Sequence, residues 1–190
     1  MQALLNISDR IDATLEKVSS AVGWLFIVTT IVIAFDVITR KFGYQMPHLG
    51  STRLQELEWH LHTALFAFWL GTSYIKNSHV RIDVAFLNAS ARTVVKAELI
   101  GCLLFALPYC LLAIYYSADF TLVAWIDGEA SPSSNGLHYR WIPKGCLTAG
   151  LILLFAGVIS VFMRSIVYLY GDPKLRDAAK SNFALIADKE

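Results

Sequence analysis

The chain has 190 residues, of which 56% are hydrophobic and 16% are charged, and its net charge at pH 7 is +1. This composition is more apolar than that of a typical soluble domain, so it points to a protein that resides in a membrane. The acidic and basic residues are spread along the chain without a basic stripe, which argues against a nucleic-acid-binding surface.

The first 20 residues are predicted to form an amphipathic helix. Leu4, Ile7, Ile11, Leu15 and Val18 recur at the spacing of one helical face. Charged residues interrupt the apolar ones early, unlike the continuous apolar core of a cleavable signal peptide. We therefore expect the chain to keep this segment, which would lie on the membrane and lead into the first span.

Four later stretches are long and apolar enough to cross a bilayer. A crossing of roughly 30 Å takes about 20 helical residues, and the last two stretches exceed this, which predicts tilt or extension beyond the lipid. Pro108 is a candidate for a kink in the third. The predicted fold class is all-α integral membrane, with four tilted transmembrane helices plus short interfacial amphipathic helices in one membrane domain, residues 1–190. The predicted spans are about 21–38, 59–75, 97–125 and 141–170, followed by a tail over 171–190.

The distribution of Lys and Arg orients these spans. The N-terminal segment, the Lys76–Lys96 loop and the end of the chain carry most of the 16 basic residues. Because positively charged segments stay in the cytoplasm, both termini and the tail are predicted to be cytoplasmic.

The predicted outer side contains two connecting segments. Glycine and proline residues end the first helix, and Thr52 with Gln55 forms a capping box for the second. Glu56 and Glu58 follow, where the positive end of the helix dipole favours carboxylates. The serine-rich stretch Gly128–Gly136 is predicted to be an exposed turn.

Ionisable residues within or beside the spans are candidates for function. Asp36 lies four residues before Arg40, so an intrahelical ion pair is favoured over a transported-ion site. His60 and His62 point to different faces of a helix, so interfacial hydrogen bonding is favoured over joint metal ligation.

Other patterns argue against an enzyme. The first, third and fourth spans contain no histidine, which argues against haem held between facing helices. The three cysteines lie in apolar runs without CxxC spacing, so we expect buried thiols and neither metal nor redox chemistry. Gly145 and Ala149 form a small-xxx-small pair that would let another helix approach the fourth span.

The Lys76–Lys96 loop has two interpretations from its chemistry. His79, Arg81 and Asp83 alternate with apolar residues, which suits a segment held at the membrane surface or against a partner. A solvated positive-inside loop explains the same residues equally well. The triplet ending at Ser90 has the form of a glycosylation site, but on the cytoplasmic side a helix cap is favoured.

Three stretches then suggest a family. Arg40-Lys41-Phe42-Gly43 precedes the acidic Glu56-Leu57-Glu58, the block from Phe68 to Tyr74 leads into His79–Val84, and Trp141-Ile142-Pro143 opens the last span. In this order around four spans, covering about 21–170, they resemble the small membrane subunit, the Q or DctQ-type subunit, of tripartite ATP-independent periplasmic (TRAP) transporters.

The resemblance implies a scaffold subunit in the bacterial inner membrane. Its expected partners are membrane lipids, a periplasmic substrate-binding protein and a large membrane subunit, whose elevator domain would import an organic anion with sodium. Substrate sites and sodium coupling then belong to other chains, and no cofactor, metal, catalytic or substrate-binding residue is expected here. The candidates for subunit contacts or helix ends are Arg40, Glu56, Glu58, Arg81, Asp83, Trp141, Gly145 and Ala149.

Two alternatives remain open at this point. A membrane redox or quinone-linked four-helix protein would bind haem or quinone. A self-sufficient small transporter would give uptake when expressed alone, although the sequence lacks the repeated halves that surround a midplane site in many transporters.

Overall fold

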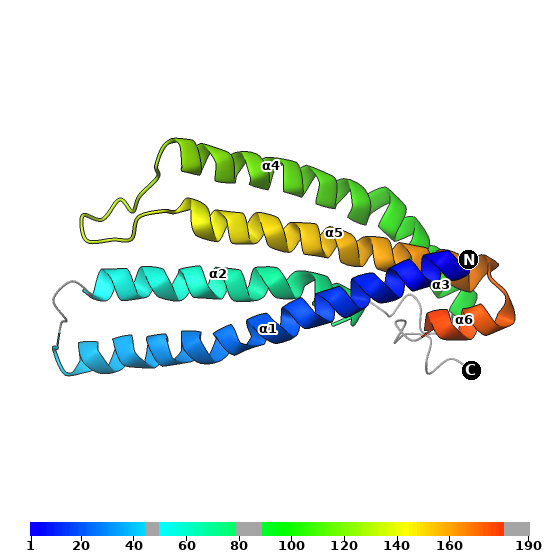
Figure 1. The fold of residues 1–190 in the computed structure, drawn as a ribbon, viewed down its shortest axis with the longest axis horizontal. Helices are drawn as coiled ribbons and strands as arrows, with labels where there is room; N and C mark the ends of the chain where they lie inside the picture. Colours follow the sequence, from blue (N-terminus) through cyan, green and yellow to red (C-terminus); the bar gives the residue numbers. More distant parts are fainter. Residues whose placement is uncertain (45–49, 79–88, 181–190) are drawn as a thin grey trace. The chain divides into compact units, whose positions relative to one another are not determined.

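The computed structural model describes residues 1–44, 50–78 and 89–180, and within these the regular structure is entirely helical. The helices appear in chain order in Figure 1. They are α1 (Gln2–Lys41), α2 (Ser51–Ile75), α3 (Ala91–Gly101), the π-helical turn η2 (Cys102–Ala106), α4 (Leu107–Ile126), α5 (Trp141–Tyr170) and α6 (Pro173–Ala179).

Among the described residues, three helical stretches are long and apolar enough to span a membrane: α1, the continuous helix Ala91–Ile126, and α5. They contain 40, 36 and 30 residues, or about 60, 54 and 45 Å at 1.5 Å per residue. The second predicted span is helical, as α2, but does not meet the same standard of hydropathy. Its first half carries charged residues and two histidines that lower its apolar character.

The chain divides into two compact units. The first contains residues 1–17, 70–112 and 152–190, and the second contains 18–69 and 113–151. The helices α1, α2, α4 and α5 each contribute residues to both. The first unit has an apolar core that includes Leu15, Val95, Cys102, Val158 and Val167.

The predicted amphipathic segment and first span form one uninterrupted helix, α1. Its buried face differs in part from the predicted one, because Ile7 is 49% exposed while Ser8 and Asp12 are buried beside Leu5 and Leu15. The difference has a chemical reason. The buried polar residues are matched by polar residues of α5, which a search for apolar periodicity does not detect.

The predicted kink site at Pro108 is preceded by a π turn. The backbone N–H of Leu107 donates to the carbonyl of Cys102, five residues earlier. Pro108 has no N–H to donate to the carbonyl four residues before it, so the regular hydrogen-bond ladder fails at this position. A π turn is one of the recognised ways in which a helix accommodates such a fault.

The connecting segments follow their local chemistry. Gly128 ends α4 with φ +59, a left-handed conformation that glycine adopts without a Cβ clash. Ser90 is the N-cap of α3 and accepts a hydrogen bond from the backbone N–H of Thr93 at 3.3 Å, which confirms the predicted cap. The predicted capping box at Thr52 and Gln55 is wrong, because α2 begins at Ser51 and Thr52 lies within the helix, while the carbonyl of Gly50 accepts from the N–H groups of Arg53 and Leu54.

Candidate functional site

Glu56 anchors the loop between α4 and α5 in the second unit. Its carboxylate accepts a short hydrogen bond from the Ser131 hydroxyl and one of 2.5 Å from the backbone N–H of Leu137. The Arg140 guanidinium lies 3.6 Å from the same carboxylate. Burial alone would raise the pKa of Glu56, but these hydrogen bonds and the Arg140 charge outweigh it and hold the pKa below its ordinary value. Glu56 is therefore a fixed anion that orders the loop.

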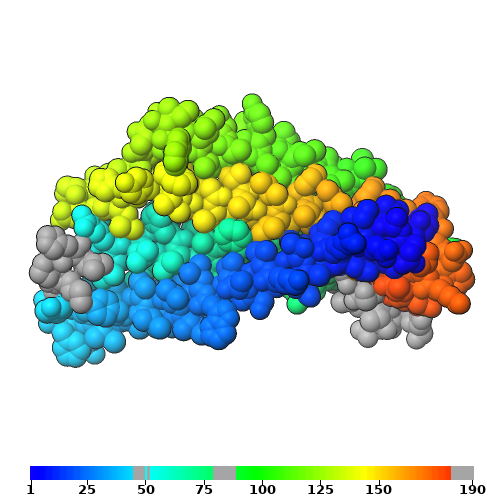
Figure 2. Space-filling view, viewed as in Figure 1, coloured from blue at the N-terminus to red at the C-terminus, as the bar shows by residue number. Residues whose placement is uncertain are grey.

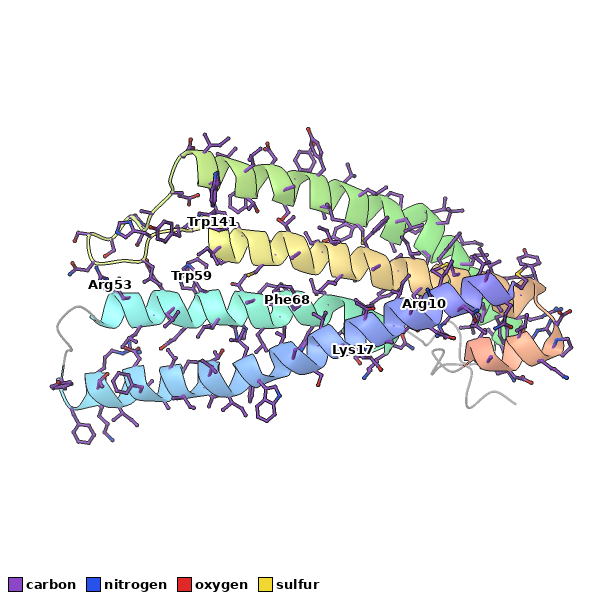
Figure 3. The ribbon with its side chains drawn as sticks, in the orientation of Figure 1. Arg10, Lys17, Arg53, Trp59, Phe68 and Trp141 are labelled. Atoms are coloured by element: carbon purple, nitrogen blue, oxygen red, sulfur yellow. The ribbon has the colours of Figure 1, made fainter. Side chains whose placement is uncertain are left out.

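Two other residues of α2 hold the same loop. Arg53 donates from Nε to the carbonyl of Asn135 at 3.2 Å. The Arg140 guanidinium carbon lies 5.7 Å from the ring centroid of Trp59, within the range of a cation–π contact. Arg53, Trp59 and Trp141 are labelled in Figure 3. The serine-rich stretch is thus exposed at Ser133 and Ser134, as predicted, whereas Ser131 is held by Glu56.

Trp141, a predicted contact residue, has a partner within the chain. Its ring packs edge to face against Trp125 of α4, with centroids 4.5 Å apart. One turn further along α5, Lys144 pairs with Glu129 and lies 3.6 Å from the ring centroid of Phe120. These contacts join the end of α4 and the loop after it to the start of α5.

Of the two small residues predicted to allow close helix packing on α5, Gly145 and Ala149, Gly145 faces α4 of the same chain. A Cβ on Gly145 would meet Thr121 at 3.6 Å, an ordinary contact, and Ala149 is half-buried. The hydroxyl of Thr148 also bonds Ser117 at 2.7 Å and Thr121 at 3.0 Å. Neither observation places another subunit at this pair.

The closest backbone approaches occur at glycines that the sequence analysis did not single out. In the second unit, a Cβ on Gly150 would lie 2.4 Å from the carbonyl oxygen of Ala67. In the first unit, a Cβ on Gly71 would lie 2.6 Å from the carbonyl oxygen of Leu153, and one on Gly157 would lie 3.0 Å from that of Gly71. Ala67 with Gly71 is itself a small-xxx-small pair on α2, which is the signal that could have identified this packing.

The predicted ion pair between Asp36 and Arg40 is confirmed. Asp36 is fully buried. Burial, and after it the negative charge of Asp36, raises the pKa of Glu58 on α2. His60 contacts the backbone carbonyl of Glu56 through Nδ1, in agreement with the predicted hydrogen-bonding role, while His62 is exposed. The described residues contain no group of three or more side chains placed to hold a metal ion.

A buried ionic cluster in the first unit was not predicted at all. Arg164 on α5 is 4% exposed and donates from Nη2 to Asp9 at 2.6 Å and to Asp12 at 2.8 Å. The Ser160 hydroxyl donates to Asp12 at 2.5 Å and lies 2.6 Å from that of Ser8. The start of α1 accordingly lies beside the C-terminal part of α5 (Figure 2). The sequence feature that could have indicated this cluster is a pair of polar residues four positions apart on each helix, Ser8 with Asp12 and Ser160 with Arg164.

Two predicted contact residues, Arg81 and Asp83, lie outside the described residues. Elsewhere, large apolar side chains point outward from the apolar helices, including Trp24 at 72% exposure and Phe105 at 72%. A surface of this kind is expected to face lipid or a partner subunit and not water.

The chain matches a protein-family model over most of its length. The family described as "Tripartite ATP-independent periplasmic transporters, DctQ component" matches residues 29–167. This range runs from the middle of α1 to the last turn of α5. No curated protein and no solved structure matches the chain.

Proposed function

This chain belongs to the DctQ component family of tripartite ATP-independent periplasmic transporters, and we propose that it is the fixed membrane scaffold of such a transporter. The family is a transporter component and not an enzyme family. The observation that carries the proposal is that the family match reaches every long helix, from the middle of α1 to the last turn of α5.

We propose that α2 is a fourth membrane crossing, over about residues 59–75. Two of its polar groups are satisfied inside the protein: the Thr72 hydroxyl donates to the carbonyl of Leu15 at 2.9 Å, and the Trp69 indole N–H donates to that of Ser19 at 3.0 Å. Polar groups that are hydrogen-bonded within the protein are tolerated at membrane depth, so low hydropathy does not prevent a crossing. Four crossings place both termini on one side, and the positive-inside rule makes that side the cytoplasm.

The scaffold role agrees with the way in which the charged side chains are used. Glu56, Lys144 and Arg164 each have an ion-pair partner within the chain. Charges paired in this way fix helix ends and loops, and they leave little from which a coupled ion and substrate site could be built.

The remaining roles in our proposal fall to other chains. A periplasmic binding protein would deliver an organic anion, and a large membrane subunit would move it inward with sodium by an elevator motion. This chain would bind neither substrate nor cofactor. Its outward apolar side chains would contact lipid and the large subunit.

Reconstitution tests the proposal directly. Vesicles that contain this chain, the large subunit and the binding protein should take up substrate with a sodium gradient, whereas vesicles with this chain alone should not. Flux through this chain alone would contradict the proposal in favour of a self-sufficient transporter. A Soret absorbance or bound quinone in the purified chain would favour a redox protein.

A further inference from the structure

Four aromatic side chains line a small pocket where α4 ends and α5 begins. The pocket has a volume of about 250 Å³ and lies within the second unit. Its lining residues are Trp125, Gly128, His138, Tyr139 and Trp141. The ring planes of Trp125 and Trp141 meet edge to face at 77°, and those of His138 and Tyr139 at 64°. The pocket therefore has aromatic walls in more than one direction.

Tyr139 has an unusual backbone conformation for a residue of its size. Its φ is +66, in the left-handed region that bulky side chains rarely adopt. Two hydrogen bonds hold this part of the loop: the N–H of Arg140 donates to the carbonyl of Glu129 at 3.1 Å, and the N–H of Ile142 donates to that of Tyr139 at 3.0 Å. The Tyr139 side chain is 65% exposed, so burial of the ring does not explain the conformation. A strained residue of this kind is typical of a ligand-binding site.

The pocket lies where the membrane surface is expected. The helices α4 and α5 belong to stretches that are apolar enough to span a membrane, and the pocket forms where they are connected. Ile126 is 71% exposed beside Trp125, and Ile142 is 47% exposed beside Trp141. Exposed apolar side chains of a membrane helix face lipid, and tryptophan and tyrosine rings prefer the depth of the lipid headgroups. The part of a lipid that meets this pocket is therefore its headgroup.

The chemistry of the pocket favours a cation. The faces of tryptophan and tyrosine rings are electrostatically negative and attract ammonium groups. Arg140 and Lys144 are close in the sequence but do not line the pocket, and they pair with Glu56 and Glu129. Asp127, directly before the pocket glycine, is exposed and adds a negative charge nearby. A cationic ligand thus complements both the aromatic walls and the neighbouring carboxylate.

We propose that this pocket binds the ammonium headgroup of a membrane phospholipid, such as phosphatidylethanolamine, through cation–π contacts with Trp125, Tyr139 and Trp141. The acyl chains of the lipid extend along the apolar surfaces of α4 and α5. The proposal depends on the membrane placement of these helices and not on the transport function. A lipid bound here fixes the connected ends of α4 and α5 at the membrane surface.

Native mass spectrometry of the full chain in detergent tests this proposal. The chain is given equal amounts of phosphatidylethanolamine and phosphatidylglycerol with the same acyl chains, of which only the first carries an ammonium group. We expect preferential retention of phosphatidylethanolamine. Trp125→Leu and Tyr139→Gly should each weaken its binding about two- to fivefold, as expected for the loss of one cation–π contact.

The choice of variants separates binding from folding. Glycine adopts a φ of +66 without strain, so Tyr139→Gly removes the ring and preserves the loop conformation. Trp24→Leu is the matched control, because it removes a tryptophan of α1 that is 72% exposed and lies outside the pocket. This control should leave the preference for phosphatidylethanolamine unchanged.

A second experiment requires no substitution. Choline is compared with its uncharged carbon analogue, in which a tert-butyl group replaces the trimethylammonium group. In nuclear magnetic resonance spectra of the wild-type chain, the indole signals of Trp125 and Trp141 should shift with choline and not with the analogue. The signal of Trp24 should respond to neither compound.

Several outcomes would overturn the proposal. They are equal retention of the two lipids, a preference that survives both Trp125→Leu and Tyr139→Gly, and equal shifts of the indole signals with choline and its analogue. Indole signals that respond to a purified periplasmic binding protein but not to phosphatidylethanolamine would also overturn it, and would assign the pocket to a basic side chain of that partner.

Discussion

Arg164 and Asp12 are 152 positions apart in the chain, yet they are joined by two hydrogen bonds, from Nε at 3.1 Å and from Nη2 at 2.8 Å. The pair is buried, and Asp12 also accepts from Ser160. It ties the beginning of α1 to the last part of α5 within one compact unit. The N-terminal segment is thus held by specific polar contacts as well as by apolar packing.

We predict that Arg164→Ala destabilises the protein by roughly 3 to 5 kcal/mol, because it leaves the buried carboxylate of Asp12 without its cation. Arg10→Ala, which removes an exposed arginine of the same unit, should change stability by less than about 0.5 kcal/mol. Thermal unfolding of the purified complex measures both. Equal effects of the two substitutions would show that the buried pair contributes nothing specific.

The same cluster predicts a compensating double substitution. Arg164→Met combined with Asp12→Leu removes both charges, so it should recover part of the stability lost in Arg164→Ala. The comparison is made by the same unfolding measurement. A double variant less stable than either single variant would mean that the cluster stabilises by more than charge pairing.

Gly150 and Gly145 provide a matched pair of glycine substitutions on α5. Gly150→Ala places a methyl group 2.4 Å from the Ala67 carbonyl and should cost roughly 1 to 3 kcal/mol through overpacking. Gly145→Ala meets Thr121 at 3.6 Å and should be neutral or stabilising by up to about 1 kcal/mol. Unfolding temperatures of the two variants check this order, and a reversed order would contradict the close approach at Gly150.

Because the ionised Glu56 side chain anchors the loop between α4 and α5, we expect this loop to be sensitive to acid. Its pKa in the folded protein lies below the ordinary value of 4.5, so the folded state binds fewer protons than the unfolded state. The stabilisation of the folded loop by ionised Glu56 is fully present when the pH is above the ordinary pKa of a glutamate. It is lost as the pH falls through the lower pKa that Glu56 has in the folded protein. Protease cleavage within Gly128–Gly136 should therefore increase in acid in the wild-type protein. In Glu56→Gln it should be raised already at neutral pH and change little with pH; a wild-type loop indifferent to acid would contradict the anchor.

The proposed topology predicts which positions can be labelled from outside. In a cysteine-free background, Ser133→Cys in the loop before α5 should react with a membrane-impermeant thiol reagent on intact spheroplasts. Gln2→Cys should react only after the membrane is opened. Labelling of Gln2→Cys from outside would exclude a cytoplasmic N-terminus.

Much of the helical framework could be predicted from local sequence. The last predicted span, 141–170, has the same bounds as α5, because Trp141 opens a long apolar run that ends near Tyr170. The Asp36–Arg40 pair follows from spacing on one helix, and the Ser90 cap follows from the residue type. Each of these features depends only on residues close together in the chain.

The features that were not predicted depend on distant residues. Arg164 looks like a flanking positive charge, and only the packing of α1 on α5 shows that it is buried. Glu56 was assigned to a helix end, whereas its partners Ser131 and Leu137 come from a loop more than 70 positions later. Periodicity and charge patterns describe one helix at a time, so they do not identify such partners.

The π turn before Pro108 affects how this helix is read. Seven positions separate buried Val95 from buried Cys102, as two regular turns require, but eight separate Cys102 from buried Cys110. The second interval is one residue longer than two regular turns. The wider π turn accommodates this extra residue, so that both cysteines still face the interior. A helical wheel drawn straight through this region would assign the wrong residues to the lipid side, and deletion of one residue near Leu104 would be expected to turn Cys110 away from the core.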